Sequence, residues 1–552
     1  MKNFIKIAAF ALVAVLASFC ANPEKMAKMA SLVKTSCEPG TLECVANQIK
    51  AKYTLTFPGD YFLPKAIVKI TPVLVYDGGE EKGPEFWLQG EKVRNNYAVI
   101  PYKTGSSISR TVTFGYKKGM EKATLELRAT VYNDSKTKSF EFPIPYKVAE
   151  GTNCTYMLVN ANGLPTFEGD EYQKEFNVNY ETQILFDINK ADVKKARLNS
   201  DEVKEFEKFI KEAQKDSYTT IEGSKIIGYA SPEGPVGKNN ALAEKRAGAA
   251  KKAYDKTISK RANLNVPVTV EEKGEDWEGF QNLVKNSNIE DKELIIRVLS
   301  MYSDPVVRER EIRNMSQVFQ TLSTKILPLL RRSRIVADIT KKNFSDEELV
   351  KMVEDNDNRL DEEALLYSTK LFSDRSVKKS LYKKAAEKFN SNRAYNNLAA
   401  MELEEGHANE AAMLLNRMNE KTQGYYNNYG VVEMQKGNFE KAKEYFELAD
   451  NDEARENMGA IDILEGKYAQ AVSNLEGCNS FNNGLAKILT GDLDGALKVL
   501  TNANDPDQSY LRAIIAVRKG DETTCENELA NAFNKKSYES RCDNDIEFAA
   551  LR

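Results

Sequence analysis

Two early stretches of the chain either alternate apolar and polar residues or are mostly apolar, and both are rich in β-forming residues. They cover residues 66–76 and 123–132, and turn residues follow each of them. Alternation with a period of two is the spacing of a half-buried β-strand. Several such strands within about a hundred residues predict an all-β sandwich over residues 51–150.

Strand and helix patterns alternate over residues 175–345. Short apolar runs at 184–187, 221–228 and 266–270 are typical of strands, and 203–210 and 240–254 carry helical spacing. This βαβαβ order predicts an α/β domain. Between Glu271 and Leu330 we expect a helical insertion, with helices over 277–284, 292–299 and 307–326.

The last third of the chain repeats one pattern around glycines, at Gly406, Gly437, Gly466, Gly491 and Gly520. A small residue stands seven positions before each glycine. Five positions after the glycine, four of the five repeats have an alanine, and nine positions after it, a different four have a leucine. The exceptions are Cys525 at an alanine position and Phe446 at a leucine position. We therefore predict helix pairs that turn at the glycine and approach closely at the small residue, which the large residue covers. An all-α repeat solenoid is expected over residues 346–552.

Length and composition exclude several functions. A chain of 552 residues needs several domains, and a net charge of −4 gives no basic excess for nucleic-acid binding. The one histidine, His407, falls at a turn of the repeats and nearly excludes sites that depend on histidine, such as catalytic triads and most zinc centres. We expect no catalytic residue, no metal, no cofactor and no nucleic-acid partner.

The N-terminus has the pattern of an export signal. Lys2 and Lys6 precede an apolar run from Ile7 to Phe19, which is too short to span a bilayer. Cys20 then follows in a context similar to a bacterial lipobox, in which the cysteine is lipidated; ordinary signal cleavage is the alternative. A signal peptide is thus expected over residues 1–20, with membrane attachment through a lipid anchor.

An exported chain permits disulfides. Cys37 and Cys44 are close enough in sequence to close a small loop, and residues 21–50 have the composition of a linker. This pair is the candidate disulfide.

Four collinear motifs within residues 180–340 resemble one family. They are residues 186–190, the glycine-bounded loop 228–234, the helix start 239–247 and residues 332–335. Together they are similar to the OmpA-like domain, a peptidoglycan-binding module of bacterial envelopes. The resemblance implies that the central domain has this fold and that peptidoglycan is its ligand.

The same resemblance implies a set of ligand-binding residues. Arg246 corresponds to the family's carboxylate-binding arginine and Asn239 to its supporting amide, while Asp187 and Asn189 line the ligand. An arginine fork suits a carboxylate and an aspartate suits an ammonium, the two charges of the diamino acid of peptidoglycan.

This sequence departs from the family at two positions. Ser231 stands at the ammonium-binding aspartate, where Glu233 is the substitute carboxylate. Ser333 stands at an arginine, leaving Arg332 or Arg334 to compensate. A hydroxyl brings no charge, so either peptidoglycan binding survives these changes or the fold persists as a scaffold.

The glycine-centred repeats resemble tetratricopeptide repeats, although their spacings of 31, 29, 25 and 29 are shorter than the usual 34. This resemblance implies a protein or peptide partner in the concave face. The domain order is similar to that of Bacteroidota envelope lipoproteins. We therefore expect a non-enzymatic protein of the outer membrane, facing the periplasm, that tethers the membrane to peptidoglycan. The alternative is a scaffold or accessory factor of an outer-membrane transport or secretion complex.

Overall fold

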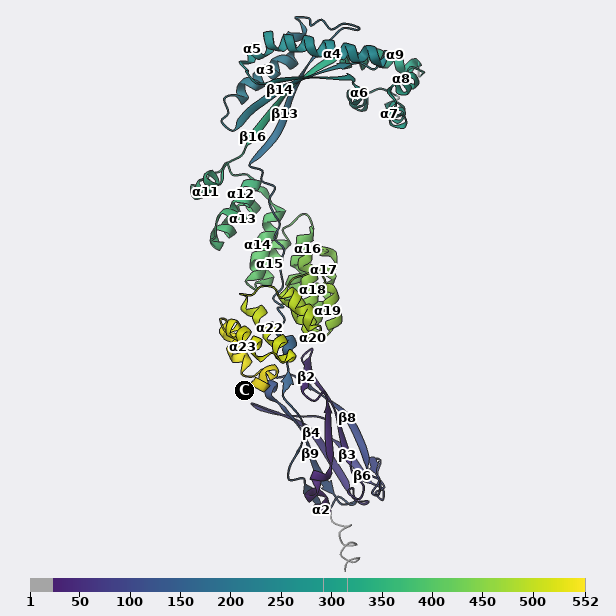
Figure 1. Ribbon diagram of the computed structural model, residues 1–552, viewed down its shortest axis with the longest axis vertical. Coiled ribbons are helices and arrows are strands. Elements are labelled where there is room, and N and C mark those ends of the chain that lie inside the picture. Colours follow the sequence, from purple (N-terminus) through teal and green to yellow (C-terminus); the bar gives the residue numbers. More distant parts are fainter. Residues whose placement is uncertain (1–22, 291, 315, 552) are drawn as a thin grey trace, which may run out of the picture. The chain divides into compact units, whose positions relative to one another are not determined.

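The computed structural model describes residues 23–551 except 291 and 315. The chain forms two compact units (Figure 1). One joins Met1–Gly169 with Arg375–Arg552, and the other is Asp170–Asp374. The expected signal peptide and Cys20 lie outside the described residues.

Two sheets with a shared hydrophobic core make up the N-terminal β-rich region, as the alternation predicts. The first sheet contains β1 (Lys34–Glu38), β2 (Leu42–Val45), β3 (Gln48–Phe57), β8 (Ser106–Gly115) and the short β12 (Thr152–Asn153). The second contains β4 (Ile67–Tyr76), β5 (Gly79–Lys82), β6 (Phe86–Gly90), β7 (Ala98–Ile100), β9 (Thr124–Tyr132), β10 (Ser139–Glu141) and β11 (Tyr146–Glu150). Alternate residues of β3 and β9, among them Leu55 and Leu125, point into the common core.

The expected linker over residues 21–50 is wrong. Helix α2 (Pro23–Lys28), a 3-10 turn (η1, Ala30–Leu32) and strands β1 and β2 occupy it, and β3 begins at Gln48. Both short strands pair antiparallel with β3. These two strands are only four or five residues long and contain charged residues. Their sequence therefore cannot be distinguished from that of a loop.

The second unit is built on a four-stranded sheet in the order β13-β16-β14-β15. Its strands are β13 (Glu175–Leu185), β14 (Thr219–Ala230), β15 (Val268–Glu275) and β16 (Arg332–Lys342). Helix α3 (Asp201–Ala213) follows β13 and is capped by Ser200, whose hydroxyl accepts from Val203 N. Helix α4 (Val236–Ala253) follows β14 and continues through a π-helical turn (η5, Tyr254–Ile258) into α5 (Ser259–Ala262). Two helices beyond the sheet, α11 (Asp346–Glu354) and α12 (Glu362–Ser368), also belong to this unit, so the repeat array begins later than the predicted residue 346.

The insertion predicted before the last strand is present. It contains α6 (Trp277–Lys285), α7 (Lys292–Met301), α8 (Pro305–Asn314), α9 (Ser316–Lys325) and α10 (Leu327–Leu330). Helical residues 305–314 and 316–325 cover the helix expected over 307–326. Phe280, Val284, Ile295 and Leu330 are buried together in a small core of the insertion's own.

The C-terminal part of the first unit is an all-helical repeat array. After α13 (Arg375–Phe389) the pairs are α14 (Asn392–Glu404) with α15 (Ala408–Leu415), α16 (Gln423–Gln435) with α17 (Phe439–Ala449), α18 (Asp452–Leu464) with α19 (Tyr468–Asn474), α20 (Phe481–Leu489) with α21 (Leu493–Val499), and α22 (Pro506–Lys519) with α23 (Glu522–Ala532). Helix α24 (Lys536–Cys542) and the 3-10 helix η7 (Ile546–Leu551) complete it.

The repeat pattern predicted from the sequence is confirmed in detail. All five turn glycines have positive φ, from +76° to +85°, a region that glycine enters without strain. A Cβ on Gly430 would come within 2.4 Å of Phe446, and one on Gly459 within 2.4 Å of Leu475. At these glycines the two helices of a pair approach closely, and the large residue of the same repeat packs against the glycine.

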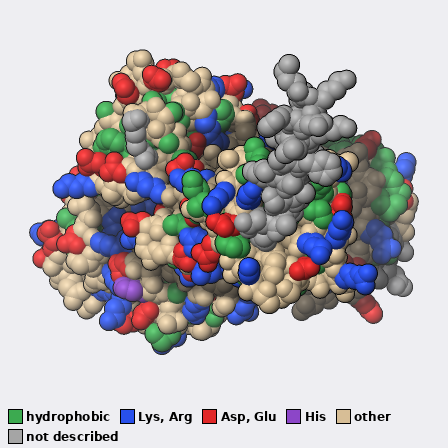
Figure 2. All heavy atoms as spheres, turned by 90° about the horizontal axis from the view of Figure 1, so that it is seen from below, with side chains coloured by type: hydrophobic (Ala, Val, Ile, Leu, Met, Phe, Trp, Pro, Cys, Tyr) green, Lys and Arg blue, Asp and Glu red, His purple; other side chains and the backbone are tan. Residues whose placement is uncertain are grey.

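The surface carries charges of both signs. Lysine and arginine side chains are interspersed with aspartate and glutamate on the face shown in Figure 2. Among the described side chains visible there, lysines and arginines form no continuous stripe of the kind that follows a nucleic-acid backbone. Among the residues described, no helix combines the length and the apolar composition needed to cross a bilayer.

Candidate functional sites

The residues expected to bind peptidoglycan gather where β14 ends and α4 begins. Arg246, on α4, is the centre of this group and is only 1% exposed. Its Nε donates to the carbonyl oxygen of Lys190 at 3.0 Å, its Nη1 to that of Tyr229 at 3.0 Å and its Nη2 to that of Asp187 at 3.3 Å. All three nitrogens of the guanidinium are therefore bonded to the backbone of the chain itself.

Burial changes the chemistry of this arginine. Burial first, and then the nearby charge of Arg331, together lower the pKa of Arg246 to about 10. A guanidinium that is shielded from solvent and satisfied by carbonyls is arranged to hold two loops together. It is not presented to an external carboxylate.

Ser231 and Glu233 form a closed polar group with an arginine that the sequence analysis missed. The Ser231 hydroxyl donates to Glu233 Oε1 at 2.6 Å. Arg331 donates through Nε to Oε1 at 2.8 Å and through Nη2 to Oε2 at 3.1 Å of the same carboxylate. Glu233, expected to replace the family's ammonium-binding aspartate, is thus already paired in a bidentate geometry.

Asn239 lies beside this group. Its Nδ2 donates to the Gly234 carbonyl at 2.9 Å and to Glu275 Oε1 at 2.8 Å. Asp187 pairs with Lys194 at 2.5 Å, which lowers the pKa of its carboxyl, and Asn189 is exposed with a φ of +55°. The structure therefore brings Arg246 to the backbone of Asp187, places Asn239 at the loop that contains Ser231 and Glu233, and leaves Asn189 facing solvent.

The positions around Ser333 do not supply a free arginine. Arg332 pairs with the buried Asp276 at 2.7 Å, and Arg334 donates through Nε to Glu181 at 2.9 Å. Ser333 is completely buried in the middle of the sheet, between β13 and β14, and its Oγ has no hydrogen-bond partner. The compensation expected from Arg332 or Arg334 would require breaking an existing ion pair.

A second site lies in the first unit, along the repeat array. Residues 159–168, which follow the β-rich region, run in an extended conformation past the first helix of successive pairs. The segment passes α20 at Asn160 and α14 at Glu168, so it runs from the last repeats towards the first. The groove where tetratricopeptide-like arrays hold peptides is thus occupied by the chain's own backbone.

Four asparagine side chains hold this segment by the same pair of hydrogen bonds. In each case Oδ1 accepts from a backbone N–H and Nδ2 donates to the carbonyl of the same residue. The pairs are Asn482 with Asn160 (2.9 and 3.0 Å), Asn457 with Leu164 (2.7 and 2.9 Å), Asn428 with Thr166 (2.7 and 2.9 Å) and Asn397 with Glu168 (2.7 and 2.8 Å). We call these four residues the asparagine clamp. Each member is at most 4% exposed.

The clamp recognises backbone, and a few contacts add sequence specificity. Leu164, Thr166 and Glu168 are alternate residues, the period at which an extended chain turns the same groups to one side. Gly163 has a φ of +85°, and a Cβ there would come within 2.4 Å of Val431. Pro165 is buried, whereas Leu164 and Phe167 are 48% and 43% exposed. The groove therefore fits this particular segment.

Sequence reasoning missed the clamp, although a signal exists. Its four members all stand nine positions before the turn glycine of their repeat. In the fifth repeat, ending at Gly520, that position is Leu511, which is buried in the core. An asparagine in register with the repeat marks a repeated interaction, but no pattern in residues 159–168 identifies their partner.

The predicted disulfide between Cys37 and Cys44 is wrong. Both are free thiols, Cys37 half-buried and Cys44 buried. Along the same strand β3, Cys37 is opposite Tyr53 and Cys44 is opposite Ile49. Four strand residues separate these positions by roughly 13 Å, and a disulfide requires Cα atoms less than about 7 Å apart.

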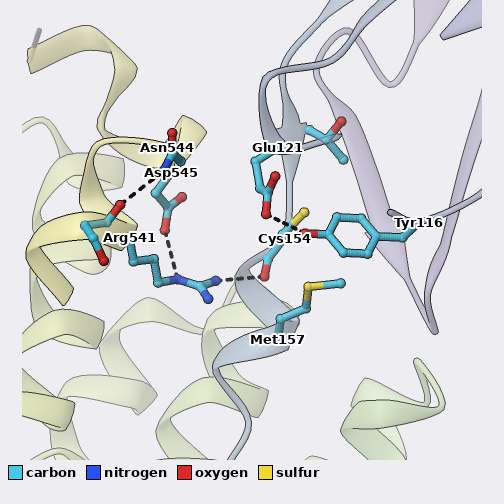
Figure 3. Close-up of a pocket in the computed structure, with 9 residues that line it drawn as sticks. Tyr116, Glu121, Cys154, Met157, Arg541, Asn544 and Asp545 are labelled. Atoms are coloured by element: carbon cyan, nitrogen blue, oxygen red, sulfur yellow. Dashed lines mark hydrogen bonds and ion pairs between the residues drawn. The ribbon is translucent and has the colours of Figure 1, made fainter. Parts of the chain in front are cut away.

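A cavity of about 230 Å³ lies between the β-rich region and the last helices of the array. In Figure 3, Arg541 reaches from the helices to the Cys154 carbonyl oxygen, at 3.0 Å, and Tyr116 points to Glu121. Arg541 also lies 3.6 Å from Asp545, whose pKa is raised by burial. The cavity is smaller than most small-molecule sites, and its polar groups bond to one another.

One group of potential metal ligands occurs in the part of the chain that the structure describes. Glu402, Glu405 and His407 place one ligand atom each within 4.8 Å of one another. Lys379 forms ion pairs with both carboxylates, and Arg375 pairs with Glu405 at 2.9 Å. The group is a surface charge network whose carboxylates are already neutralised.

Comparison with known proteins gives little further information. No protein-family model and no curated protein matches the chain. A crystal structure of the APC/C hetero-tetramer Cut9-Hcn1 is similar over 57% of this chain and 71% of that one, with 14% sequence identity and a TM-score of 0.32. A likeness at this level gives no information about function. The helical repeats are established by the helix pairs described above.

Proposed function

We propose that this protein is a non-enzymatic scaffold of the bacterial cell envelope, exported and anchored by lipid at Cys20. The asparagine clamp is the observation that carries the proposal. A repeat array that binds a segment of its own chain uses for structure a surface that such arrays otherwise use to bind partners. A protein partner would bind outside this groove, as in an accessory factor of an outer-membrane transport or secretion complex.

The α/β unit, with the strand order and motifs that resemble the OmpA-like domain, serves in this proposal as a scaffold element. Peptidoglycan binding in the manner of the family needs a free arginine and a free carboxylate. Here Arg246 is bonded to three carbonyls and Glu233 to Arg331. Opening either arrangement would leave a buried charge unpaired, which costs several kcal/mol.

Tethering to peptidoglycan is the second candidate function. The observation that favours it is the convergence of Asp187, Ser231, Asn239 and Arg246 on one end of the sheet. Exchange of Lys194 for the ligand's ammonium at Asp187 would retain one charged contact of the family's mode, because that ion pair is largely exposed.

Retention of the full-length mature chain on purified peptidoglycan sacculi separates the two candidates. The scaffold proposal expects no more retention than that of a bead control at physiological salt. Retention that a soluble diaminopimelate-containing muropeptide competes away would overturn it in favour of the tether. An Asp187→Asn variant, matched with Asp201→Asn on the exposed start of α3, would then test the remaining charged contact.

Export and anchoring have their own test. Radiolabelled palmitate supplied to the producing bacterium is expected to enter the protein, and Cys20→Ser is expected to abolish the label and to move the protein from the membrane fraction to the periplasmic fraction. Unchanged membrane association without label in the wild-type chain would refute the lipid anchor.

A further inference from the structure

Cys44 and Cys154 occupy neighbouring positions although 110 residues separate them in the sequence. Strands β2 and β12 pair in parallel, with Leu42 opposite Thr152 and Glu43 opposite Asn153. The next position in that register brings Cys44 beside Cys154, which directly follows β12. Adjacent strands lie about 4.8 Å apart, inside the Cα separation of about 4.4–6.8 Å that a disulfide spans.

The side chains are enclosed together as well as the backbones. Both residues are buried, Cys44 at 3% and Cys154 at 6% exposure, and each thiol has the largest influence on the pKa of the other. Cys44 Sγ also lies 3.8 Å from the Tyr156 hydroxyl, which the backbone and side chain of Asn47 hold at 2.8 Å. The pair is thus held in place from both sides.

We propose that Cys44 and Cys154 are a disulfide site, which closes in an oxidising compartment and fastens the β-rich region to the start of the segment held by the asparagine clamp. That the chain meets such a compartment rests on the proposed export. The bond's position gives it a role, because the Cys154 carbonyl accepts from Arg541 and the clamped segment begins five residues later. The disulfide would therefore join β2 to Cys154, and the hydrogen bond from Arg541 connects Cys154 to the last helices.

The chemistry is thiol–disulfide exchange with a protein or small-molecule disulfide as the oxidant. The Cys44 thiolate attacks one sulfur of the oxidant, forms a mixed disulfide and expels a thiolate. The Cys154 thiolate then attacks the Cys44 sulfur and expels the second thiolate. The protons lost by the two cysteines go to these leaving groups, so two protein thiols become one disulfide and the oxidant becomes two thiols. The neighbouring Cys154 thiol lowers the pKa of Cys44, which favours Cys44 as the first nucleophile.

The test uses the purified full-length chain in a buffer of oxidised and reduced glutathione. After acid quenching and alkylation with N-ethylmaleimide, digestion without reductant and mass spectrometry are expected to find the Cys44 peptide linked to the Cys154 peptide. Oxidation is expected to raise the Tm of the first unit by roughly 5–10 °C. Cys44→Ser and Cys154→Ser should each abolish the link and the shift, while Cys37→Ser, on β1 of the same sheet, should leave both unchanged.

Recovery of both cysteines in alkylated form from a folded chain, or linkage of either one to a different cysteine, would overturn the proposal. Alkylation of intact producing cells before lysis tests the export separately. A link that forms in the glutathione buffer but is absent from cells would refute export and leave the disulfide site standing.

Discussion

The side-chain amide of Asn428 forms two hydrogen bonds with the backbone of Thr166, 262 residues earlier in the chain. One amide satisfies both the N–H and the C=O of a residue that an extended conformation leaves without partners. The same arrangement recurs along the array. The helices thereby supply the segment with backbone hydrogen bonds of the kind that a neighbouring strand supplies in a β-sheet. The array and the segment therefore depend on each other for their order.

Replacing Asn428 tests that dependence. Asn428→Ala removes both bonds to Thr166 and a third to Asn396 Oδ1, at 2.8 Å. With about 1 kcal/mol for each bond, we expect a local loss of roughly 2–3 kcal/mol. Hydrogen exchange followed by mass spectrometry should show at least tenfold faster exchange over residues 160–168.

A matched control is Asn534→Ala, since Asn534 is an exposed asparagine in the same array. It should leave exchange in the segment unchanged. Equal protection of residues 160–168 in both variants would show that the asparagine amides do not hold the segment.

Gly163 tests how closely the segment fits. Alanine there would need a positive φ and would place Cβ 2.4 Å from Val431 Cγ1. We expect Gly163→Ala to lower the thermal stability of the first unit by roughly 1–3 kcal/mol. Adding Val431→Ala should restore part of the loss by making room, but not the part caused by φ.

Gly169 provides the control for this substitution. Its Cβ position has no atom within 4 Å, so Gly169→Ala should be nearly neutral. If the two alanine variants melt alike in a calorimeter, the contact with Val431 is not a constraint on the segment.

The regular features of the array are predictable from the sequence because each depends on neighbours at a fixed spacing. Gly437 turns the chain, Gly430 admits Phe446, and both positions recur in every repeat. The partner of Asn428 is not predictable in this way. Thr166 belongs to no repeat and lies in a stretch with the composition of a connecting loop, so only the folded array shows what the amide binds.

The α/β site shows the same limit for charged residues. The motif spacing correctly brings Arg246 to Asp187 and the loop after β14. Whether a guanidinium faces solvent or backbone depends on where carbonyls point, and no motif encodes that. Arg331 and Asp276 were missed because their roles arise from pairing with Glu233 and Arg332 in the folded structure.

Arg246 should consequently behave as a structural residue. Arg246→Gln shortens the side chain and removes three bonds to carbonyls, and we expect the α/β unit to lose roughly 2–4 kcal/mol of stability to urea. Lys245→Gln, at the exposed neighbouring position, should have little effect. An Arg246→Gln variant as stable as the wild type would return this arginine to the candidates for ligand binding.

Glu456 gives the array a pH dependence of known sign. Burial raises the pKa of this carboxyl more than the nearby Ser480 and Asn482 lower it, and its Oε2 has no hydrogen-bond partner. The carboxyl of Glu456 therefore holds its proton more tightly in the folded state than in the unfolded state. Stability falls as the pH rises from the unfolded pKa through the folded one.

Glu456→Gln, which cannot ionise, should melt at a higher temperature than the wild type at pH 8 and at nearly the same temperature at pH 4. Glu440→Gln, on the exposed side of α17, should show no such divergence, and a difference that is the same at both pH values would mean that ionisation of Glu456 is not its cause.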